Sequence, residues 1–473
     1  MEKIIGRKKE IRLLEEYEHS NKPEFVVICG RRRVGKTFLI RHCFKNRFAF
    51  YLSGAENTTT KAQLKNFNVA IHTYSGYPYP IVTNWQDAFL QLQHYIDNTT
   101  VKKKFIIFFD EMPWLDNNKS GFLSAFEYFW NTFASARNNI LFIACGSATS
   151  WIVNKIINNR GGLHNRITRQ IFLEPFTLHE TEQFLHSRKI KMNRIQITEC
   201  YMIMGGIPYY LEQIDKSIGL IQNIDNLFFN KNGILHNEFS RLFTSLFKHG
   251  ENYVKIVKAL GKKNKGLTRD EIIKATKLTD GGRLSAMLDE LELCGFIRIN
   301  DSFGKRKKNR LYQLIDFYSM FYLNFIESNK NSIKNYWSII KNSSVYKAWL
   351  GFSFEKLCIS HSYQIRRKLG ITGVLSFTSA WRYFNDKHGA QIDLIIDRND
   401  GIINICEMKF SQKKYQITKS EGESFLNKIA LFQEDTKTNK TIHFTLISTF
   451  GAKHNVYWND IQSEVTMEDL FLE

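Results

Sequence analysis

The feature that most constrains this chain is the segment at residues 30–37, Gly-Arg-Arg-Arg-Val-Gly-Lys-Thr, which matches the pattern G-x-x-x-x-G-K-[ST]. An apolar run at 25–29 precedes it, and Phe38-Leu39-Ile40 after it opens a helical pattern. A strand, a glycine-containing loop and a helix N-terminus in this order surround phosphate groups with backbone N–H donors. The segment therefore predicts nucleoside triphosphate binding on an α/β fold with a parallel sheet.

The residues of this loop have separate expected tasks. Gly30 and Gly35 permit backbone angles and a close approach that a Cβ would prevent. Lys36 can reach the β- and γ-phosphates, and the Thr37 hydroxyl can ligate Mg²⁺. The nucleotide-binding residues expected here are Gly30, Arg31, Arg32, Arg33, Val34, Gly35, Lys36 and Thr37.

A second run, Phe105 to Phe109, is followed by the carboxylates Asp110 and Glu111. Five apolar residues predict a buried parallel strand that delivers these charges to its C-terminal edge. Asp110 would hold Mg²⁺ through water, and Glu111 would orient and deprotonate the attacking water. An acidic pair can also be a strand end entering solvent, but its occurrence together with the phosphate loop favours hydrolysis.

Ser147 follows another apolar run, 141–145, and the turn residue Gly146. Its strand should end at the same sheet edge as Asp110, where a hydroxyl could sense the γ-phosphate or position water. A simple turn serine explains the spacing equally well.

Composition bounds the class of protein. A length of 473 residues predicts about three or four domains. The formal net charge of +20 favours DNA or another polyanion as partner, although a Lys- and Asn-rich proteome would also give a basic protein. Seven cysteines without C-x-x-C pairs indicate reduced core residues and a cytoplasmic location. No apolar stretch is long enough to predict a signal peptide or a membrane span, so no membrane partner is expected.

The pattern along the chain predicts four domains: an ATPase core at 1–172, a helical lid at 173–250, a winged helix at 251–330 and a C-terminal α/β domain at 331–473. Thr177 is the expected N-cap of a lid helix. Strands of the core are expected at 25–29, 48–52, 105–109, 140–145 and 170–173.

The winged-helix prediction rests on three helical patterns followed by a hairpin with the basic tip 304–309. The third helix, 283–293, is the one that would enter a major groove. Such a domain can equally serve as an internal lid or as a protein contact.

A second constellation lies near the C-terminus. Apolar runs on both sides of Asn399-Asp400-Gly401 predict a hairpin that brings Asp393 beside Glu407 and Lys409. The two carboxylates could bind Mg²⁺ or Mn²⁺, with Lys409 orienting water and Glu355 on a preceding helix completing the shell. An ordinary salt bridge across a hairpin is the alternative.

Together these motifs resemble the archaeal-type, STAND-related AAA+ ATPases that carry a C-terminal PD-(D/E)xK nuclease-like domain. The resemblance implies that Ile5, Gly6 and Arg7 border the adenine and that the turn with Gly206 and Pro208 touches the base. It also implies that Arg166, or its rival Arg160, faces a γ-phosphate. A rigid helix start is the alternative explanation for Gly206 and Pro208. The order Glu355, Gln391, Asp393, Glu407, Lys409 is similar to the nuclease motif, which implies a restriction-endonuclease-like C-terminal domain.

The sequence thus predicts an ATPase that hydrolyses ATP with Mg²⁺ and is coupled to DNA binding or processing. The alternative is a STAND-type switch that holds ATP and uses its C-terminal domain as a non-cleaving interaction module. An ATP-dependent homo-oligomer is possible in either case.

Overall fold

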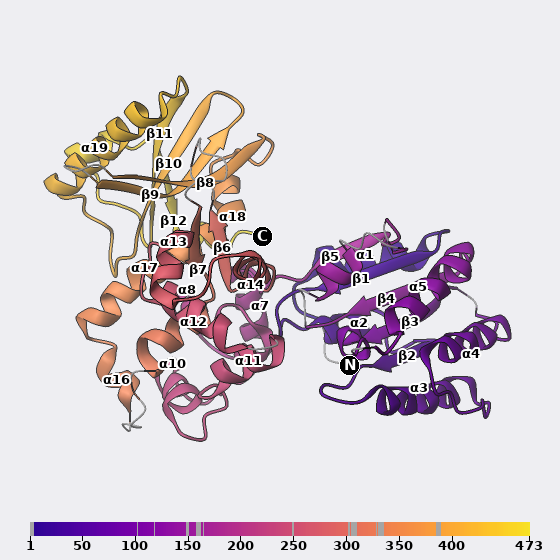
Figure 1. The fold of residues 1–473 in the computed structure, drawn as a ribbon. Helices are drawn as coiled ribbons and strands as arrows, with labels where there is room; N and C mark the ends of the chain where they lie inside the picture. Colours follow the sequence, from indigo (N-terminus) through magenta and orange to yellow (C-terminus); the bar gives the residue numbers. More distant parts are fainter. Residues whose placement is uncertain are drawn as a thin grey trace. The chain divides into compact units, whose positions relative to one another are not determined.

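The computed structural model describes residues 4–101, 103–117, 119–147, 151–157, 162–163, 165–247, 250–300, 303, 310–327, 329, 335–384 and 389–473. The chain divides into two compact units, Met1–Pro175 and Phe176–Glu473 (Figure 1). The division into four domains stays a prediction.

The first unit contains a parallel sheet with the strand order β2-β3-β4-β1-β5. Every residue of β1, β3 and β4 is buried, as expected for parallel strands covered on both faces. This order places the ends of β1, β4 and β3 side by side at the carboxyl edge. The strands are β1 Glu24–Cys29, β2 Phe50–Ser53, β3 Phe105–Asp110, β4 Ile140–Cys145 and β5 Arg169–Phe172.

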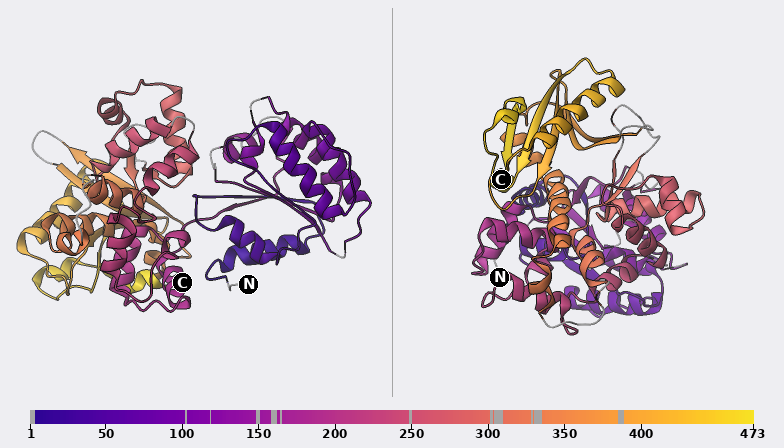
Figure 2. Two further views of the ribbon diagram at one scale, coloured as in Figure 1. Left: turned by 90° about the horizontal axis from the view of Figure 1, so that it is seen from below. Right: turned by 90° about the vertical axis from the view of Figure 1, so that its left-hand side faces the viewer.

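Helices cover both faces of this sheet, α1 and α2 on one side and α3 to α5 on the other (Figure 2). The α3–α5 side holds a core rich in aromatic rings, in which Phe126 packs on Phe142 with a centroid distance of 4.8 Å. Thr59 and Asn84 cap α3 and α4 through their side chains. The helices are α1 Lys8–His19, α2 Lys36–Cys43, α3 Thr60–Ser75, α4 Trp85–Asp97 and α5 Phe122–Thr132.

The second unit begins with a helical region. The predicted N-cap Thr177 is confirmed, because it forms a capping box with Glu180 at the start of α7. The helices are α7 Leu178–Ser187, α8 Arg194–Met204, α9 Pro208–Leu211, α10 Leu220–Ile224 and α11 Glu238–Leu246.

Three helices and an antiparallel strand pair follow, in the order expected of a winged helix. They are α12 Gly250–Gly261, α13 Arg269–Thr276, α14 Gly282–Leu293, β6 Ile297–Asn300 and β7 Leu311–Leu314. The predicted major-groove helix α14 exposes Arg283 but also Asp289 and Glu292. The basic tip at 304–309 lies outside the described residues.

The C-terminal part of the unit contains a mixed sheet with the order β12-β11-β10-β9-β8, covered on one side by α19 (Figure 1). Its core includes Phe425 on Phe444 and Trp381 on Phe432, at centroid distances of 5.0 and 5.4 Å. The strands are β8 Ser376–Phe384, β9 Gly389–Arg398, β10 Ile402–Lys409, β11 Thr441–Ser448 and β12 Ser463–Thr466. The helices of the region after β7 are α15 Phe317–Phe321, α16 Tyr336–Ile340, α17 Ser344–Ser360, α18 Ser362–Lys368 and α19 Lys419–Thr436.

The strands expected in the first unit occur where the sequence places them, with one clear shift. The strand expected at 48–52 begins only at Phe50, because Phe50 is the first residue paired with β3, opposite Ile107. Over the described residues, no helix is both long enough and apolar enough to cross a membrane.

Candidate nucleotide site and C-terminal carboxylate site

The two glycines of the phosphate loop are required for different reasons. Gly30 has φ +142°, and a Cβ there would lie 2.3 Å from the carbonyl oxygen of Leu173, which follows β5. Gly35 has φ +91° and ends the loop as the N-cap of α2, with no atom within 4 Å of an added Cβ. The first glycine therefore allows close packing, and the second allows the left-handed backbone at the start of α2.

Lys36 is folded into the loop that it follows. Its Nζ donates to the carbonyl oxygens of Gly30 and Arg31 at 2.9 and 3.0 Å. Burial lowers the pKa of this lysine, and nearby acidic groups, Glu111 and Asp110 among them, act in the opposite direction. An anionic phosphate chain in the loop would supply further compensating charge.

Asp110 stands at the end of β3 with both carboxylate oxygens engaged. Oδ1 accepts from the Thr37 hydroxyl at 3.1 Å and from the Cys145 thiol at 2.8 Å. Oδ2 accepts from the Tyr51 hydroxyl at 3.4 Å. The predicted pair Thr37 and Asp110 is therefore brought together.

Glu111 adopts the left-handed conformation, with φ +46°. Its Oε2 accepts two hydrogen bonds from Ser147, one from the backbone N–H and one from the hydroxyl, each at 2.9 Å. Ser147 therefore does more than make a turn, because it fixes the carboxylate expected to act on water.

The N-terminal element contacts the loop. Gly6 and Arg7 are consecutive left-handed residues, and an Arg7 guanidinium nitrogen donates to the Val34 carbonyl at 3.3 Å. Ile5 is half-buried. Whether these residues border an adenine stays a prediction.

The three loop arginines differ in their surroundings. Arg31 is buried, whereas Arg32 and Arg33 are half-buried. Arg33 has φ +72°.

The other nucleotide residues expected from the sequence are not brought to this edge by any described contact. Arg166 is exposed ahead of β5, and Arg160 lies outside the described residues. Gly206 and Pro208 belong to the second unit. There, a Cβ on Gly206 would meet the Phe176 carbonyl oxygen at 2.4 Å, which supports a structural reason for this glycine.

Sequence reasoning missed three residues around Asp110, namely Tyr51, Arg41 and Cys145. An Arg41 nitrogen donates to the Tyr51 hydroxyl at 2.9 Å. Burial raises the pKa of Tyr51, Asp110 raises it further and Arg41 lowers it. The spacing of Arg41 four residues after Thr37 on one helix face was the available signal.

In the C-terminal sheet, the predicted hairpin is present. The antiparallel register pairs Leu394 with Cys406, and continuing it by one pair sets Asp393 opposite Glu407 on one face. Burial, together with the charge of Asp393, raises the pKa of Glu355, on α17, to about 7. The structure thus brings Glu355, Asp393, Glu407 and Lys409 into one neighbourhood.

The surroundings of Glu407 differ from those expected. Its two oxygens form ion pairs with Lys409 at 3.1 Å and with Lys428 of α19 at 2.7 Å. Sequence reasoning did not single out Lys428. Within the described ranges no group of three or more His, Cys, Asp and Glu side chains is arranged to hold a metal ion.

Gln391 supports the Asp393 carboxylate, two residues further along β9. Its Nε2 donates to Asp393 Oδ1 at 2.7 Å, and its buried Oε1 accepts no hydrogen bond in the described part of the chain. An acceptor without a donor is costly in a buried position, so this oxygen is suited to a bound water or cation.

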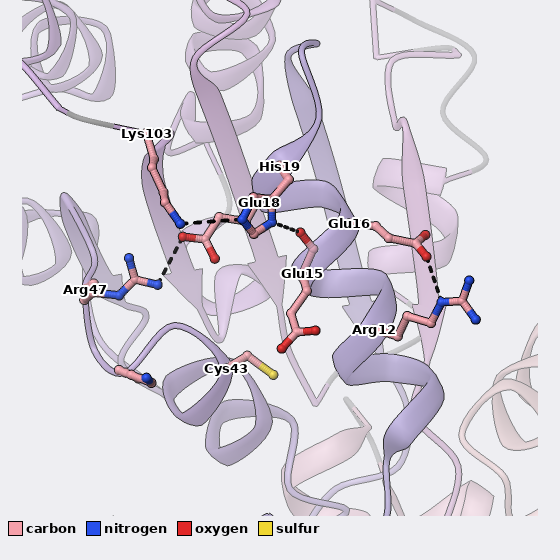
Figure 3. A pocket seen from close by; sticks show the side chains of 9 residues that line it. Arg12, Glu15, Glu16, Glu18, His19, Cys43, Arg47 and Lys103 are labelled. Atoms are coloured by element: carbon pink, nitrogen blue, oxygen red, sulfur yellow. Dashed lines mark hydrogen bonds and ion pairs between the residues drawn. The ribbon is translucent and has the colours of Figure 1, made fainter.

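A hollow of about 540 Å³ lies between α1 and the C-terminal end of α2 (Figure 3). Two ion pairs among its lining side chains, Arg47 with Glu18 and Arg12 with Glu16, offset one another's charge. Burial raises the pKa of Cys43 to about 12, so this thiol is not a nucleophile at neutral pH. Because the phosphate loop is at the other end of α2, this hollow is not the nucleotide site. Its lining residues are Arg12, Glu15, Glu16, Glu18, His19, Cys43, Lys45, Arg47 and Lys103.

The glycine loop after β1, its lysine and threonine, and the acidic end of the neighbouring strand β3 define a P-loop ATPase. Residues 4–214 match the family described as an ATPase domain predominantly from Archaea. The protein is therefore an ATPase, and its residues 4–214 are similar to that family.

Two relatives and one solved structure are similar to this chain. The chain is 26% identical to an uncharacterized protein of Methanocaldococcus jannaschii over 417 residues, 87% of this chain and 88% of that protein. An uncharacterized ATP-binding protein of the same organism is 42% identical over 44 residues, 9% of this chain and 75% of that protein. Among solved structures, a Walker-type ATPase of Pyrococcus abyssi is similar, with a TM-score of 0.50 and 20% identity over 68% of this chain and 96% of that one.

Proposed function

We propose that this ATPase hydrolyses ATP with Mg²⁺ and uses the cycle to control a DNA-processing site in its C-terminal sheet. The ATPase half rests on the loop and strand geometry above. The DNA half rests on the carboxylate neighbourhood of β9, β10 and α17.

The residues at the phosphate loop fit ATP and Mg²⁺. No atom lies within 4 Å of a Cβ built on Gly35, so the position next to this glycine is open. Lys36 places a buried ammonium group against the loop. The hydroxyl of Thr37 and the carboxylate of Asp110 are hard oxygen ligands of the kind that Mg²⁺ takes. When bound, Mg²⁺ neutralises phosphate charge.

The chain's own residues then divide the work. Lys36 and the loop amides bind the phosphates, and Thr37 with Asp110 holds the cation. Glu111 orients the attacking water and accepts its proton, while Ser147 fixes Glu111. Ile5, Gly6 and Arg7 border the base. Arg166 is the arginine proposed to reach a γ-phosphate, in a neighbouring copy if the protein oligomerises.

Measurement of ATP turnover by the full chain tests the proposed ATPase mechanism. We expect Lys36→Ala to abolish ATP binding and Glu111→Gln to slow hydrolysis by about 10²–10⁴-fold without loss of binding. Unchanged turnover in both variants would refute the assignment.

At the second site, Asp393 and Glu407 would hold Mg²⁺ or Mn²⁺, which supplies an activated water for phosphodiester cleavage. Lys409 would neutralise developing charge, and Glu355 would accept a hydrogen bond from water. The observation that carries this proposal is the hairpin register, which pairs Leu394 with Cys406 and, continued by one pair, sets Asp393 opposite Glu407. The charge of Asp393 also acts on Glu355.

Incubation of plasmid DNA with the full chain, Mn²⁺ and ATP tests the proposed DNA cleavage at the C-terminal site. Cutting by the wild type that is lost in Asp393→Ala and Lys409→Ala would support cleavage. Asp400→Asn is the matched control, because Asp400 lies at the tip of the same hairpin and pairs with Arg398. Cutting that survives in Asp393→Ala would reject the site.

One observation favours a second function, an ATP-dependent switch whose C-terminal domain binds without cutting. Both oxygens of Glu407 already pair with ammonium groups, so a metal ion would have to displace one of them. DNA binding without cutting in the plasmid experiment would support this switch.

A further inference from the structure

A contact chain leads from the surface of the first unit to Asp110. An Arg41 nitrogen donates to the Tyr51 hydroxyl at 2.9 Å, and the guanidinium lies over the same ring, 4.9 Å from its centroid. The Tyr51 hydroxyl in turn donates to Asp110 Oδ2 at 3.4 Å. The three residues come from α2, β2 and β3.

The direction of these hydrogen bonds is fixed by chemistry. A guanidinium can only donate, so the Tyr51 oxygen accepts from Arg41. The single Tyr51 proton is then available to Asp110, whose carboxylate can only accept. Arg41, together with Ser53, whose side chain also bonds to Tyr51, therefore favours the hydroxyl orientation that holds Oδ2.

The two oxygens of Asp110 are held by different groups. Oδ1 accepts from Thr37, Cys145 and the Glu111 amide. Over the described residues, Tyr51 is the hydrogen-bond donor at Oδ2. Rotation of the carboxylate about its own axis is thus limited on the Oδ2 side by a hydroxyl that Arg41 orients.

A purely structural role explains this arrangement poorly. Arg41 is exposed, and an exposed cation over a ring contributes little to stability. Tyr51 already packs on Phe108 at a centroid distance of 5.3 Å, which needs no hydroxyl.

We propose that Arg41 and Tyr51 are positioning residues for the metal–nucleotide complex, Arg41 acting through Tyr51 to orient the Asp110 carboxylate toward the divalent cation. The inference rests on the proposed role of Asp110 and adds two residues to it. The described side-chain hydrogen bonds of Arg41 and Tyr51 lead to Asp110 and not to the phosphate loop, so the two residues are expected to govern cation affinity and to leave the contact between loop and phosphates unchanged.

The experiment measures Mn²⁺ affinity by electron paramagnetic resonance, using the full chain saturated with a non-hydrolysable ATP analogue. Affinity for a fluorescent ATP analogue in EDTA is measured alongside. We expect Tyr51→Phe and Arg41→Gln each to weaken Mn²⁺ binding about tenfold, as changes to groups behind a metal ligand do. Binding in EDTA should stay within about twofold of wild type, which a merely misfolded variant would not show.

Coupling and rescue give two further readouts. Because the residues act in series, the double variant should lose about as much Mn²⁺ affinity as either single variant. Arg41→Lys retains a cationic donor and should restore most of it. Arg47→Gln is the matched control, because Arg47 is an arginine of the same unit that pairs with Glu18 instead.

The outcomes separate the two proposals. Weaker Mn²⁺ binding in Asp110→Asn with no change in Tyr51→Phe or Arg41→Gln would overturn the positioning role alone. Unchanged Mn²⁺ binding in Asp110→Asn would overturn the assignment of Asp110 and this inference with it. Losses that multiply in the double variant would also reject the serial arrangement.

Discussion

Both donors of Ser147, its backbone N–H and its hydroxyl, converge on one oxygen of Glu111, each across 2.9 Å. The pair joins the ends of β3 and β4, two neighbouring strands of the sheet. A carboxylate held by two donors keeps one orientation, as a group that positions water must.

The Ser147→Ala variant tests this relationship. We expect kcat for ATP hydrolysis to fall about tenfold, because one of the two donors is lost and the general base is less well oriented. KM should stay within about twofold, since in the described part of the chain the side-chain hydrogen bonds of Ser147 lead to Glu111 and not to the phosphate loop. Ser135→Ala, whose hydroxyl bonds to the Asn131 carbonyl elsewhere in the unit, is the control. A change confined to KM would contradict the role.

The two loop glycines should differ in what an added methyl group does. In Gly30→Ala the Cβ would lie 2.3 Å from the Leu173 carbonyl oxygen, so backbone must move. We expect a loss of about 2–4 kcal/mol in the free energy of unfolding. Gly35→Ala meets no atom within 4 Å and should lose only about 1–2 kcal/mol from its left-handed backbone. Thermal unfolding of the two variants compares them, and equal losses would contradict the packing argument.

Much of the first site could be predicted because its signals are local. The loop at 30–37 and the strand ending in Asp110 are each continuous in sequence, and parallel strands present their carboxyl ends at one edge. Tyr51 could not be predicted, because its contact with Asp110 depends on β2 pairing with β3. No short-range sequence pattern indicates which strands are neighbours in the sheet.

The C-terminal site likewise combines residues that the sequence predicts with one, Lys428, that it does not predict. The Asp-Gly turn predicts the hairpin and hence the facing carboxylates Asp393 and Glu407. Lys428 lies about twenty residues further on, in α19, and reaches Glu407 only because that helix packs on the sheet. Helical periodicity shows which residues share a face of a helix but not which strand that face covers.

Lys428 gives a prediction about metal binding at Glu407. Replacing it in Lys428→Met removes one of the two ammonium groups that a cation would displace. We expect affinity for Mn²⁺ at this site, measured without nucleotide, to rise about fivefold, equivalent to about 1 kcal/mol for a partly exposed ion pair. The control is Lys440→Met, since Lys440 pairs with Asp397 on the same hairpin at 2.6 Å. The added affinity should vanish when Asp393→Asn is combined with Lys428→Met. A fall in affinity would mean instead that Lys428 orients Glu407 for the metal.

His361 is a buried histidine that the fold holds neutral. Its Nε2 accepts from the Leu178 backbone N–H at 3.0 Å, so Nδ1 carries the proton and donates to the Leu357 carbonyl at 2.9 Å. Burial lowers the pKa of His361 to about 4. Because the unfolded chain takes up a proton near pH 6.5 and the folded chain does not, His361 contributes stability that is lost as the pH falls from about 6.5 toward 4.

The contribution of Glu355 to stability changes with pH in the opposite direction over part of the same pH range. Its pKa is raised to about 7, so the folded state keeps a proton that the unfolded state releases, and stability from this group is lost as the pH rises from about 4.5 through 7. The absolute pH dependence of the wild type therefore mixes two opposing contributions. A comparison with His361→Gln, which keeps an acceptor for Leu178 but does not titrate, isolates the histidine. We expect the variant to be less stable than wild type at pH 7.5, and the gap to narrow by about 2 kcal/mol at pH 5.0. Urea unfolding of both full-length proteins at the two pH values measures this gap, and a gap that stays constant would show that His361 is not held neutral.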